Sequence, residues 1–191
     1  MNILCEAALL GWTRLLHLKQ PGTLEHSERT LHLSNWLGRE LGLCENQLKY
    51  LRWGALLHDI GKLGIPQDIL GKPMQLSAEE FQIMQKHIEY GMRWLKPLEF
   101  LGPAREVIHH HHEKWDGSGY PLKLQQEEIP YLARIFAVVD VYDALTSNRP
   151  YRKALPQTEA LGMIEARMGS HFDPAVAGIF LSRIKMHGPV H

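Results

Sequence analysis

The sequence predicts an all-α fold, because three features recur along its 191 residues. Apolar residues repeat at the spacing of one helix face, glycines and prolines separate these stretches, and the longest apolar segment exceeds the length of a strand. With 45% apolar residues and no internal repeat, the chain can bury one sizeable core, or two small ones at most. We therefore expect a single helical-bundle domain of about seven or eight helices over residues 23–191, preceded by a helix or linker over residues 1–22.

Three helices are expected in the first third of the chain, at residues 3–19, 24–41 and 45–59. The first is amphipathic, with its apolar face formed by Leu9, Trp12, Leu15 and Leu16. Thr23 is the expected N-cap of the second helix, in which His26 begins a buried stripe. The third helix is expected to carry His58 and Asp59 in its last turn.

Five further helices are expected, at residues 78–94, after Pro103, and at 130–147, 156–168 and 173–185. Ser77 and Glu80 form the pattern of a capping box at the start of the first of these. The segment 130–147 is apolar on nearly every side, so it belongs in the middle of the core. Its valines also suit a strand, but its length favours a helix. The Gly/Pro-rich stretches 61–73 and 113–121 are expected to be loops.

The charge balance limits the classes of partner. Lys plus Arg equals Asp plus Glu at 21 each, so no basic surface for polymeric nucleic acid is expected, although a small anionic ligand remains compatible. The two cysteines fit a reducing compartment, and the N-terminus resembles neither a signal peptide nor a membrane span, so we expect a cytoplasmic protein. The apolar face of helix 3–19 is a candidate homodimer surface.

Seven potential metal ligands lie on inward faces or ends of five expected helices, namely His26, His58, Asp59, His87, His111, His112 and Asp140. Imidazoles and carboxylates together suit first-row transition metals such as iron, manganese, nickel or zinc. Seven ligands exceed what one octahedral ion takes. Two divalent ions that share Asp59 would use the whole set. Such a pair, about 3.5–4 Å apart, activates a bridging hydroxide and holds a phosphoryl oxygen.

A purely structural interpretation of these residues stays open at this point. A lone inward histidine such as His26 is more often a hydrogen-bonded core residue than a ligand. The run His109–His112 is compatible with a solvated helix end, and Asp140 with a cap on a neighbouring helix. Asp59 beside Lys62 is compatible with a simple ion pair. Spacing alone does not exclude that all four accounts hold together.

Longer motifs follow one another in a fixed order. Residues 57–66 read LHDIGKLGIP, residues 111–121 read HHEKWDGSGYP, and His87 lies in an M-x-x-H-x-x-x-G pattern between them. With the segments around Asp140, Arg149 and Asp173, these motifs extend from about residue 23 to residue 181. In these motifs the chain resembles the HD-GYP family, a branch of the HD superfamily of metal-dependent phosphohydrolases.

The resemblance implies an all-helical fold and hydrolysis of cyclic di-GMP, a bacterial second messenger. It also assigns metal ligation to the seven residues above. On this basis we expect one ion at His26, His58, Asp59 and Asp140, and a second at Asp59, His87, His111 and His112. In the mechanism we expect, a bridging hydroxide attacks one phosphodiester in line, and iron or manganese is favoured over nickel or zinc.

The resemblance implies a set of substrate and partner contacts as well. If the ions balance the charge of Asp59, Lys62 is left to stabilise the phosphate or the leaving oxygen. Arg149 and Arg152 resemble the family's phosphate-contacting pair, while a flexible charged pair on a solvated helix start is the alternative. The loop motif is expected to contact diguanylate cyclase (GGDEF) domains, through Asp116, Gly117, Gly119, Tyr120 and Pro121.

One position departs from part of the family. Some members carry a glutamate one helical turn before the first histidine, where it helps to hold a third metal ion, but this chain has Gly22 there. Glu25 is expected to point about 100° away from His26 around the helix. We therefore expect two metal ions, and the linear dinucleotide pGpG rather than GMP as the main product.

Two other functions remain open on the sequence. One is hydrolysis of a different cyclic or linear nucleotide by the same type of site. The other is a non-catalytic module that binds cyclic di-GMP or a partner protein. Family members usually carry a sensory or receiver domain upstream, and only the helix 3–19 precedes the motifs in this sequence.

Overall fold

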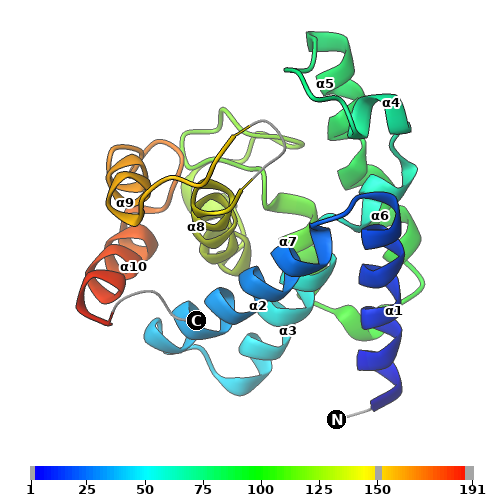
Figure 1. The fold of residues 1–191 in the computed structure, drawn as a ribbon. Helices are drawn as coiled ribbons and strands as arrows, with labels where there is room; N and C mark the ends of the chain where they lie inside the picture. Colours follow the sequence, from blue (N-terminus) through cyan, green and yellow to red (C-terminus); the bar gives the residue numbers. More distant parts are fainter. Residues whose placement is uncertain (1–2, 149–151, 188–191) are drawn as a thin grey trace.

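The computed structural model describes residues 3–148 and 152–187, and within these ranges the chain is helical and contains no strand (Figure 1). The all-α prediction is therefore confirmed. The α-helices are α1 (Ile3–Lys19), α2 (Thr23–Glu40), α3 (Glu45–Leu57), α4 (Gln67–Leu70), α5 (Ala78–Gln85), α6 (His87–Leu95), α7 (Ala104–His110), α8 (Tyr131–Thr146), α9 (Gln157–Glu165) and α10 (Pro174–His187). Three short 3₁₀-helices join them, namely η1 (Ile60–Gly64), η2 (Glu99–Leu101) and η3 (Gln126–Glu128).

Helix α3 lies between two apolar cores. Leu51 and Ala55 belong to a cluster with residues of α2, α8, α9 and α10, whereas Leu56 and Leu57 belong to a second cluster with residues of α1, α6 and α7. Figure 1 shows α9 and α10 on one side of α8, and α1 and α6 on the opposite side of the molecule. His58 directly follows α3, so the end of this helix delivers it to the boundary between the two cores.

Helix α8 is the buried helix that its apolar sequence predicts. Ile135, Phe136, Val138 and Val139 are all fully buried, each with 0% exposure. Burial of such side chains contributes about 1.5–3 kcal/mol each, so packing outweighs the lower helix propensity of valine. Helix α8 therefore fixes the position of Asp140, which follows Val139.

Helix α1 packs on α2, α3 and η1, and it buries Leu9 and Leu16. The Lys19 ammonium at its end donates hydrogen bonds to the carbonyls of Leu63 and Ile65, at 2.7 and 2.6 Å. The prediction that Leu15 shares this inner face is wrong, because Leu15 is 52% exposed. The domain division at residue 22 and self-association through α1 stay predictions.

The structure corrects three helix boundaries. The predicted helix 78–94 is divided into α5 and α6 at Lys86, whose amide bonds to Ile83 O three residues back at 3.1 Å. Helix α2 is capped by Gly22 rather than Thr23, because the chain enters it through a left-handed turn with φ of 89°. Helix α3 ends at Leu57, which leaves His58 and Asp59 in the turn before η1.

Two local predictions agree with the structure. The capping box at α5 is present, since Ser77 N donates to Glu80 Oε2 at 2.8 Å and Glu80 N donates to Ser77 Oγ at 3.3 Å. The stretch 61–73 contains η1 and the short α4 within a loop. Among the described residues, no helix combines the length and apolar character needed to cross a bilayer.

Gly61 allows η1 to approach α6 closely. A Cβ atom on Gly61 would lie 1.7 Å from the carbonyl oxygen of His87, a distance no pair of such atoms can occupy. This contact holds the turn that carries Asp59 against the first residue of α6. Glycine is therefore a steric requirement for the placement of Asp59 beside His87.

We predict that Gly61→Ala lowers the free energy of unfolding by about 3 kcal/mol, the upper part of the range for overpacking, because backbone must move to admit the methyl group. Gly162→Ala is the matched control, since a Cβ there meets nothing within 4 Å in α9. Alanine should stabilise that exposed helix position by up to about 1 kcal/mol. Urea unfolding of both variants measures the effect, and equal stability of the two would contradict the prediction.

Candidate metal centre

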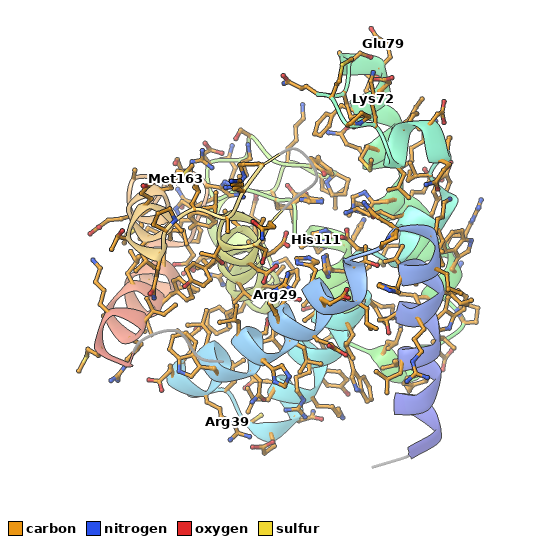
Figure 2. The ribbon with its side chains drawn as sticks, viewed as in Figure 1. Arg29, Arg39, Lys72, Glu79, His111 and Met163 are labelled. Carbon is orange, nitrogen blue, oxygen red and sulfur yellow. The ribbon has the colours of Figure 1, made fainter. Side chains whose placement is uncertain are left out.

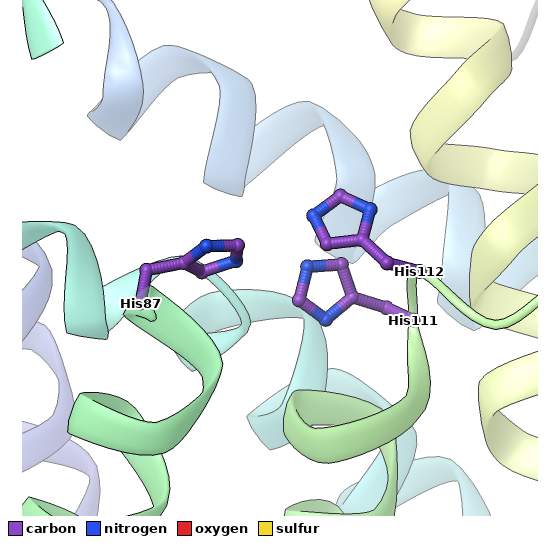
Figure 3. A group of neighbouring side chains, drawn as sticks. All are labelled: His87, His111 and His112. Atoms are coloured by element: carbon purple, nitrogen blue, oxygen red, sulfur yellow. The ribbon is translucent and has the colours of Figure 1, made fainter. Parts of the chain in front are cut away.

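Six of the seven predicted ligands form two compact groups. The potential ligand atoms of His26, His58 and Asp140 lie within 4.8 Å of one another, and so do those of His87, His111 and His112. Figure 3 shows the second group, in which the ring of His87 on α6 faces the rings of the two histidines that follow α7. These are the two sets into which the sequence analysis divided the ligands.

Asp59 lies between the two groups. Its Oδ2 atom is 3.2 Å from Nε2 of His58, and its Oδ1 atom is 3.8 Å from Nε2 of His87. One carboxylate oxygen thus faces each group. A bidentate carboxylate in this position is suited to bridging two cations.

Three of the histidines are oriented by the same kind of hydrogen bond. Their Nδ1 atoms donate hydrogen bonds to main-chain carbonyls three residues earlier, His58 to Ala55 O at 2.8 Å, His87 to Met84 O at 2.7 Å and His111 to Ile108 O at 3.1 Å. A donor at Nδ1 leaves the lone pair on Nε2, the atom that points into the site. Each of these rings lies at a helix end or in a turn, where main-chain carbonyls are accessible to side chains.

His26 is oriented by a carboxylate instead. Its Nδ1 donates to Asp143 Oδ2 at 2.7 Å, and Arg29 Nε donates to Asp143 Oδ1 at 2.6 Å. Its Nε2 lies 3.3 Å from Asp140 Oδ1. The sequence analysis missed this role of Asp143. The signal was the i, i+3 spacing from Asp140, which places both carboxylates on adjoining positions of one face of α8.

The charges of the site fit a cation. Burial lowers the pKa of His87 to about 4 and that of His112 to about 3, so both rings are neutral at pH 7. Burial opposes ionisation of Asp59, but Lys62 and His58 lower the pKa of Asp59 well below its usual range. Burial also opposes protonation of His26, yet hydrogen bonds with Asp140 and Asp143 raise its pKa to about 9. Ionised carboxylates thus stand beside the neutral rings of His87 and His112, whereas His26 keeps a proton that a bound metal ion would displace.

Two buried nitrogen atoms support the same conclusion. Nε2 of His87 and Nε2 of His111 have no hydrogen-bond partner among the described residues. A buried polar atom left unpaired costs about 1–3 kcal/mol, and such atoms call for a specific explanation. A lone pair directed at a transition metal supplies one, because neutral imidazole nitrogen and carboxylate oxygen are donors that iron, manganese, nickel and zinc accept. The donor set fits the predicted ions.

The Lys62–Asp59 ion pair, which the sequence left open, is present in the structure. The Lys62 ammonium donates to Asp59 Oδ2 at 2.6 Å. The reason is local, since residues three apart in a 3₁₀ turn lie one above the other. A contact of Lys62 with substrate stays a prediction.

The two predicted substrate arginines differ in what can be said of them. Arg149 lies outside the described residues. Arg152 lines the cleft above the metal ligands, but its guanidinium also donates to the carbonyls of Ala144 and Leu145 at the end of α8, the latter at 3.1 Å. Arg152 therefore stabilises the C-terminal end of α8 in addition to its place in the cleft.

The loop of residues 111–121 forms a wall of this cleft. The ring of Tyr120 stacks on that of His112 with centroids 4.7 Å apart. Gly119 is required there, because a Cβ would lie 2.4 Å from Lys114 N. Of the motif positions, Asp116 and Pro121 are exposed, whereas Gly117 is half-buried. Tyr120 faces the metal ligands, and a contact of the motif with diguanylate cyclase domains stays a prediction.

Glu113 is a second residue whose role the sequence analysis missed. Its carboxylate is buried and accepts hydrogen bonds from Leu122 N at 2.7 Å and Leu124 N at 3.2 Å. It directly follows His112, so it ties the loop to the metal ligands. The signal was an acidic residue directly after the ligand histidines, at the start of a Gly/Pro-rich stretch.

A cleft of about 920 Å³ opens onto the site. Its walls come from residues 111–123, from α5 and α8, and from the segments before α9 and α10. They include His111, His112, Lys114, Tyr120, Lys123, Asp140, Arg152 and His171. Figure 2 places His111 near the centre of the molecule, far from the exposed end of α5 that carries Glu79. The cleft therefore joins the central ligands to solvent.

Gly22, at which the chain departs from part of the family, has open space around it. A Cβ on Gly22 would meet nothing within 4 Å, so no side chain occupies the space beside it. Glu25 is turned away from the site, 58% exposed, with its carboxylate 3.6 Å from His17 Nδ1. Neither residue belongs to the two ligand groups found among the described residues.

Comparison with known proteins places the chain in a family. A family model described as "HD domain" matches residues 12–176. Solved structures share the fold, including a cyclic GMP-AMP-specific phosphodiesterase from V. cholerae with a TM-score of 0.69 at 23% identity, over 95% of this chain and 48% of that one. Bd1817, an HDG"Y"P protein from Bdellovibrio bacteriovorus, has a TM-score of 0.68 at 22% identity, over 84% and 51%. The chain belongs to the HD domain family.

Sequence relatives define the branch. A cyclic di-GMP phosphodiesterase of Thermotoga maritima is 44% identical over 163 residues, which are 83% of this chain and 44% of the relative. A 3'3'-cGAMP-specific phosphodiesterase of Vibrio cholerae is 39% identical over 158 residues, or 82% of this chain and 30% of the relative. Together with the motifs, these similarities place the chain in the HD-GYP branch. The chain spans less than half the length of these relatives.

We predict that Asp143→Asn weakens Mn²⁺ binding at the His26 group by about 10- to 100-fold, because the charge that orients and polarises His26 is lost. Titration calorimetry of chelator-treated protein with Mn²⁺ measures the affinity. Asp68→Asn, at an exposed position of α4, is the control and should leave it unchanged. Equal affinity of Asp143→Asn and the unaltered chain would contradict the role given to Asp143.

Proposed function

We propose that this chain is a metal-dependent phosphodiesterase that hydrolyses cyclic di-GMP. The observation that carries the proposal is the convergence of two ligand groups on one buried carboxylate at the base of an open cleft. Relatives named cyclic di-GMP phosphodiesterases in Thermotoga maritima and Vibrio cholerae support the choice of substrate.

The proposed metal ligands are His26, His58, Asp59 and Asp140 for one ion, and Asp59, His87, His111 and His112 for the other. Two divalent ions in such a site lower the pKa of water and neutralise charge on phosphoryl oxygens. Iron or manganese is proposed first, with nickel and zinc as alternatives, because the ligand set admits all four.

The side chains around the ions have distinct proposed tasks. Asp143 holds His26 with its Nε2 toward the site, and main-chain carbonyls hold three further rings. Lys62 is half-buried beside Asp59 and offers a positive charge to a phosphoryl or leaving oxygen. Tyr120 and Arg152 line the cleft in which the rest of the dinucleotide binds.

The proposed reaction opens the ring at one phosphodiester. The oxygen of a water molecule forms a bond to phosphorus, the P–O3' bond breaks, and a proton from the water passes to the 3'-oxygen. The product is the linear dinucleotide pGpG with a 5'-phosphate. Two ions rather than three are proposed, because neither Gly22 nor Glu25 offers a carboxylate to the site. On that basis further hydrolysis to GMP is expected to be minor.

A second substrate is favoured by one observation. Three relatives in Vibrio cholerae that are 36–39% identical to this chain are named 3'3'-cGAMP-specific phosphodiesterases. That dinucleotide has the same ring and two phosphates but only one guanine. A non-catalytic role in binding cyclic di-GMP, and a contact of the exposed loop edge at Asp116 and Pro121 with diguanylate cyclase domains, remain further proposals.

A product assay tests the proposed function. Protein purified without oxygen, with its metals retained, is incubated with cyclic di-GMP, 3'3'-cGAMP and linear pGpG, and the products are separated by chromatography. We predict that pGpG accumulates from cyclic di-GMP and that GMP forms at less than about one tenth of that rate, a difference of about 1.4 kcal/mol in barrier. Binding of cyclic di-GMP without cleavage, or cleavage of 3'3'-cGAMP alone, would contradict the proposal.

A further inference from the structure

Lys123 has a backbone conformation that side chains rarely adopt. Its φ of 57° lies in the left-handed region, which is costly for residues other than glycine. Such residues persist only where the surrounding structure enforces them, and they concentrate at functional sites. The left-handed conformation of Lys123 therefore has a structural cause and a functional consequence.

The cause is the buried carboxylate of Glu113. It accepts hydrogen bonds from Leu122 N and Leu124 N, the amides on either side of Lys123. Glu113 is itself fixed, with 1% exposure, next to His112. One charged group from the metal-ligand segment thus holds both neighbours of Lys123.

The consequence is the placement of a positive charge. Lys123 lines the cleft with Lys114 and Arg152, and its side chain makes no hydrogen bond or ion pair with any other described residue. The one carboxylate among the described lining residues is that of Asp140, which is 3.3 Å from His26. The side chains that line the cleft therefore carry a net positive charge, and this charge comes from residues that are not metal ligands.

We propose that Lys123 binds the phosphate of the substrate that is not cleaved. This inference rests on the proposed function, since cyclic dinucleotides carry two phosphates in one ring. The cleaved phosphate is assigned to the metal ligands and Lys62, which leaves the second phosphate in the cleft above them. An ammonium held at the loop by Glu113 supplies a charge-assisted hydrogen bond to it. Lys123 is thus a specificity residue for ligands with two phosphates.

Lys123→Gln tests the charge, and Lys123→Arg restores it. Lys123→Gln is expected to raise KM for cyclic di-GMP about five- to tenfold with kcat changed less than about twofold, because an exposed charge-assisted contact is lost. Lys123→Arg should recover most of the affinity. For bis(4-nitrophenyl) phosphate, which has a single phosphodiester, the loss in Lys123→Gln should be much smaller.

Glycine variants separate binding from backbone strain. Lys123→Gly relieves the left-handed conformation and should have the same raised KM, with a Tm within about 3 °C of the unaltered chain. Gln126→Gly is the matched control, because Gln126 has a φ of 51° three residues later, at the start of η3, but does not line the cleft. Its KM should stay within about twofold of the unaltered value.

The possible outcomes distinguish this inference from the proposed function. If the unaltered chain cleaves cyclic di-GMP and Lys123→Gln has the same KM, the assignment of Lys123 is wrong and the function stands. Equal losses on cyclic di-GMP and bis(4-nitrophenyl) phosphate would overturn the assignment to the second phosphate. A chain that neither binds nor cleaves cyclic di-GMP would overturn both proposals.

Discussion

The structure depends on one buried carboxylate. Asp59 is 6% exposed and stands between two groups of imidazoles, where an isolated negative charge would cost several kcal/mol. Neighbouring side chains that the fold brings to Asp59 offset that free-energy cost. Helix α3 brings His58 to the boundary of two cores, and Gly61 lets η1 touch α6 at His87, so that one ring lies near each oxygen of Asp59. Lys62 adds a positive charge at 2.6 Å.

A second layer of contacts determines what the ligands can do. The hydrogen bonds to Ala55, Met84 and Ile108 fix which nitrogen of each ring is available, and Asp143 does the same for His26. Glu113, which follows His112, links the ligand histidines to the loop that lines the cleft. The site is therefore positioned by rigid helix ends, and its mouth by a loop that is tied to them.

The sequence predicted much of this because apolar periodicity and long motifs are local signals. The helices predicted at residues 3–19, 24–41, 45–59 and 130–147 and the two ligand groups are present in the structure, whereas the helix predicted at 78–94 is two helices. The break at Lys86 and the cap at Gly22 were not predicted, because they depend on main-chain geometry. The roles of Asp143 and Glu113 were missed because they depend on hydrogen bonds to His26 and to the amides of Leu122 and Leu124, which form only in the folded chain. The Lys62–Asp59 ion pair was one of the alternatives that the sequence left open, and the structure contains it.

The most direct test of the account is a count of metal ions on the unaltered chain and on Asp59→Ala. Elemental analysis of protein purified without oxygen is expected to give two transition-metal ions per chain. Because both ions are proposed to share Asp59, the variant should lose both ions together with hydrolysis of cyclic di-GMP, while Asp68→Ala keeps two. Three ions on the unaltered chain, or full metal content and an unchanged rate in Asp59→Ala, would contradict a two-metal site bridged by Asp59.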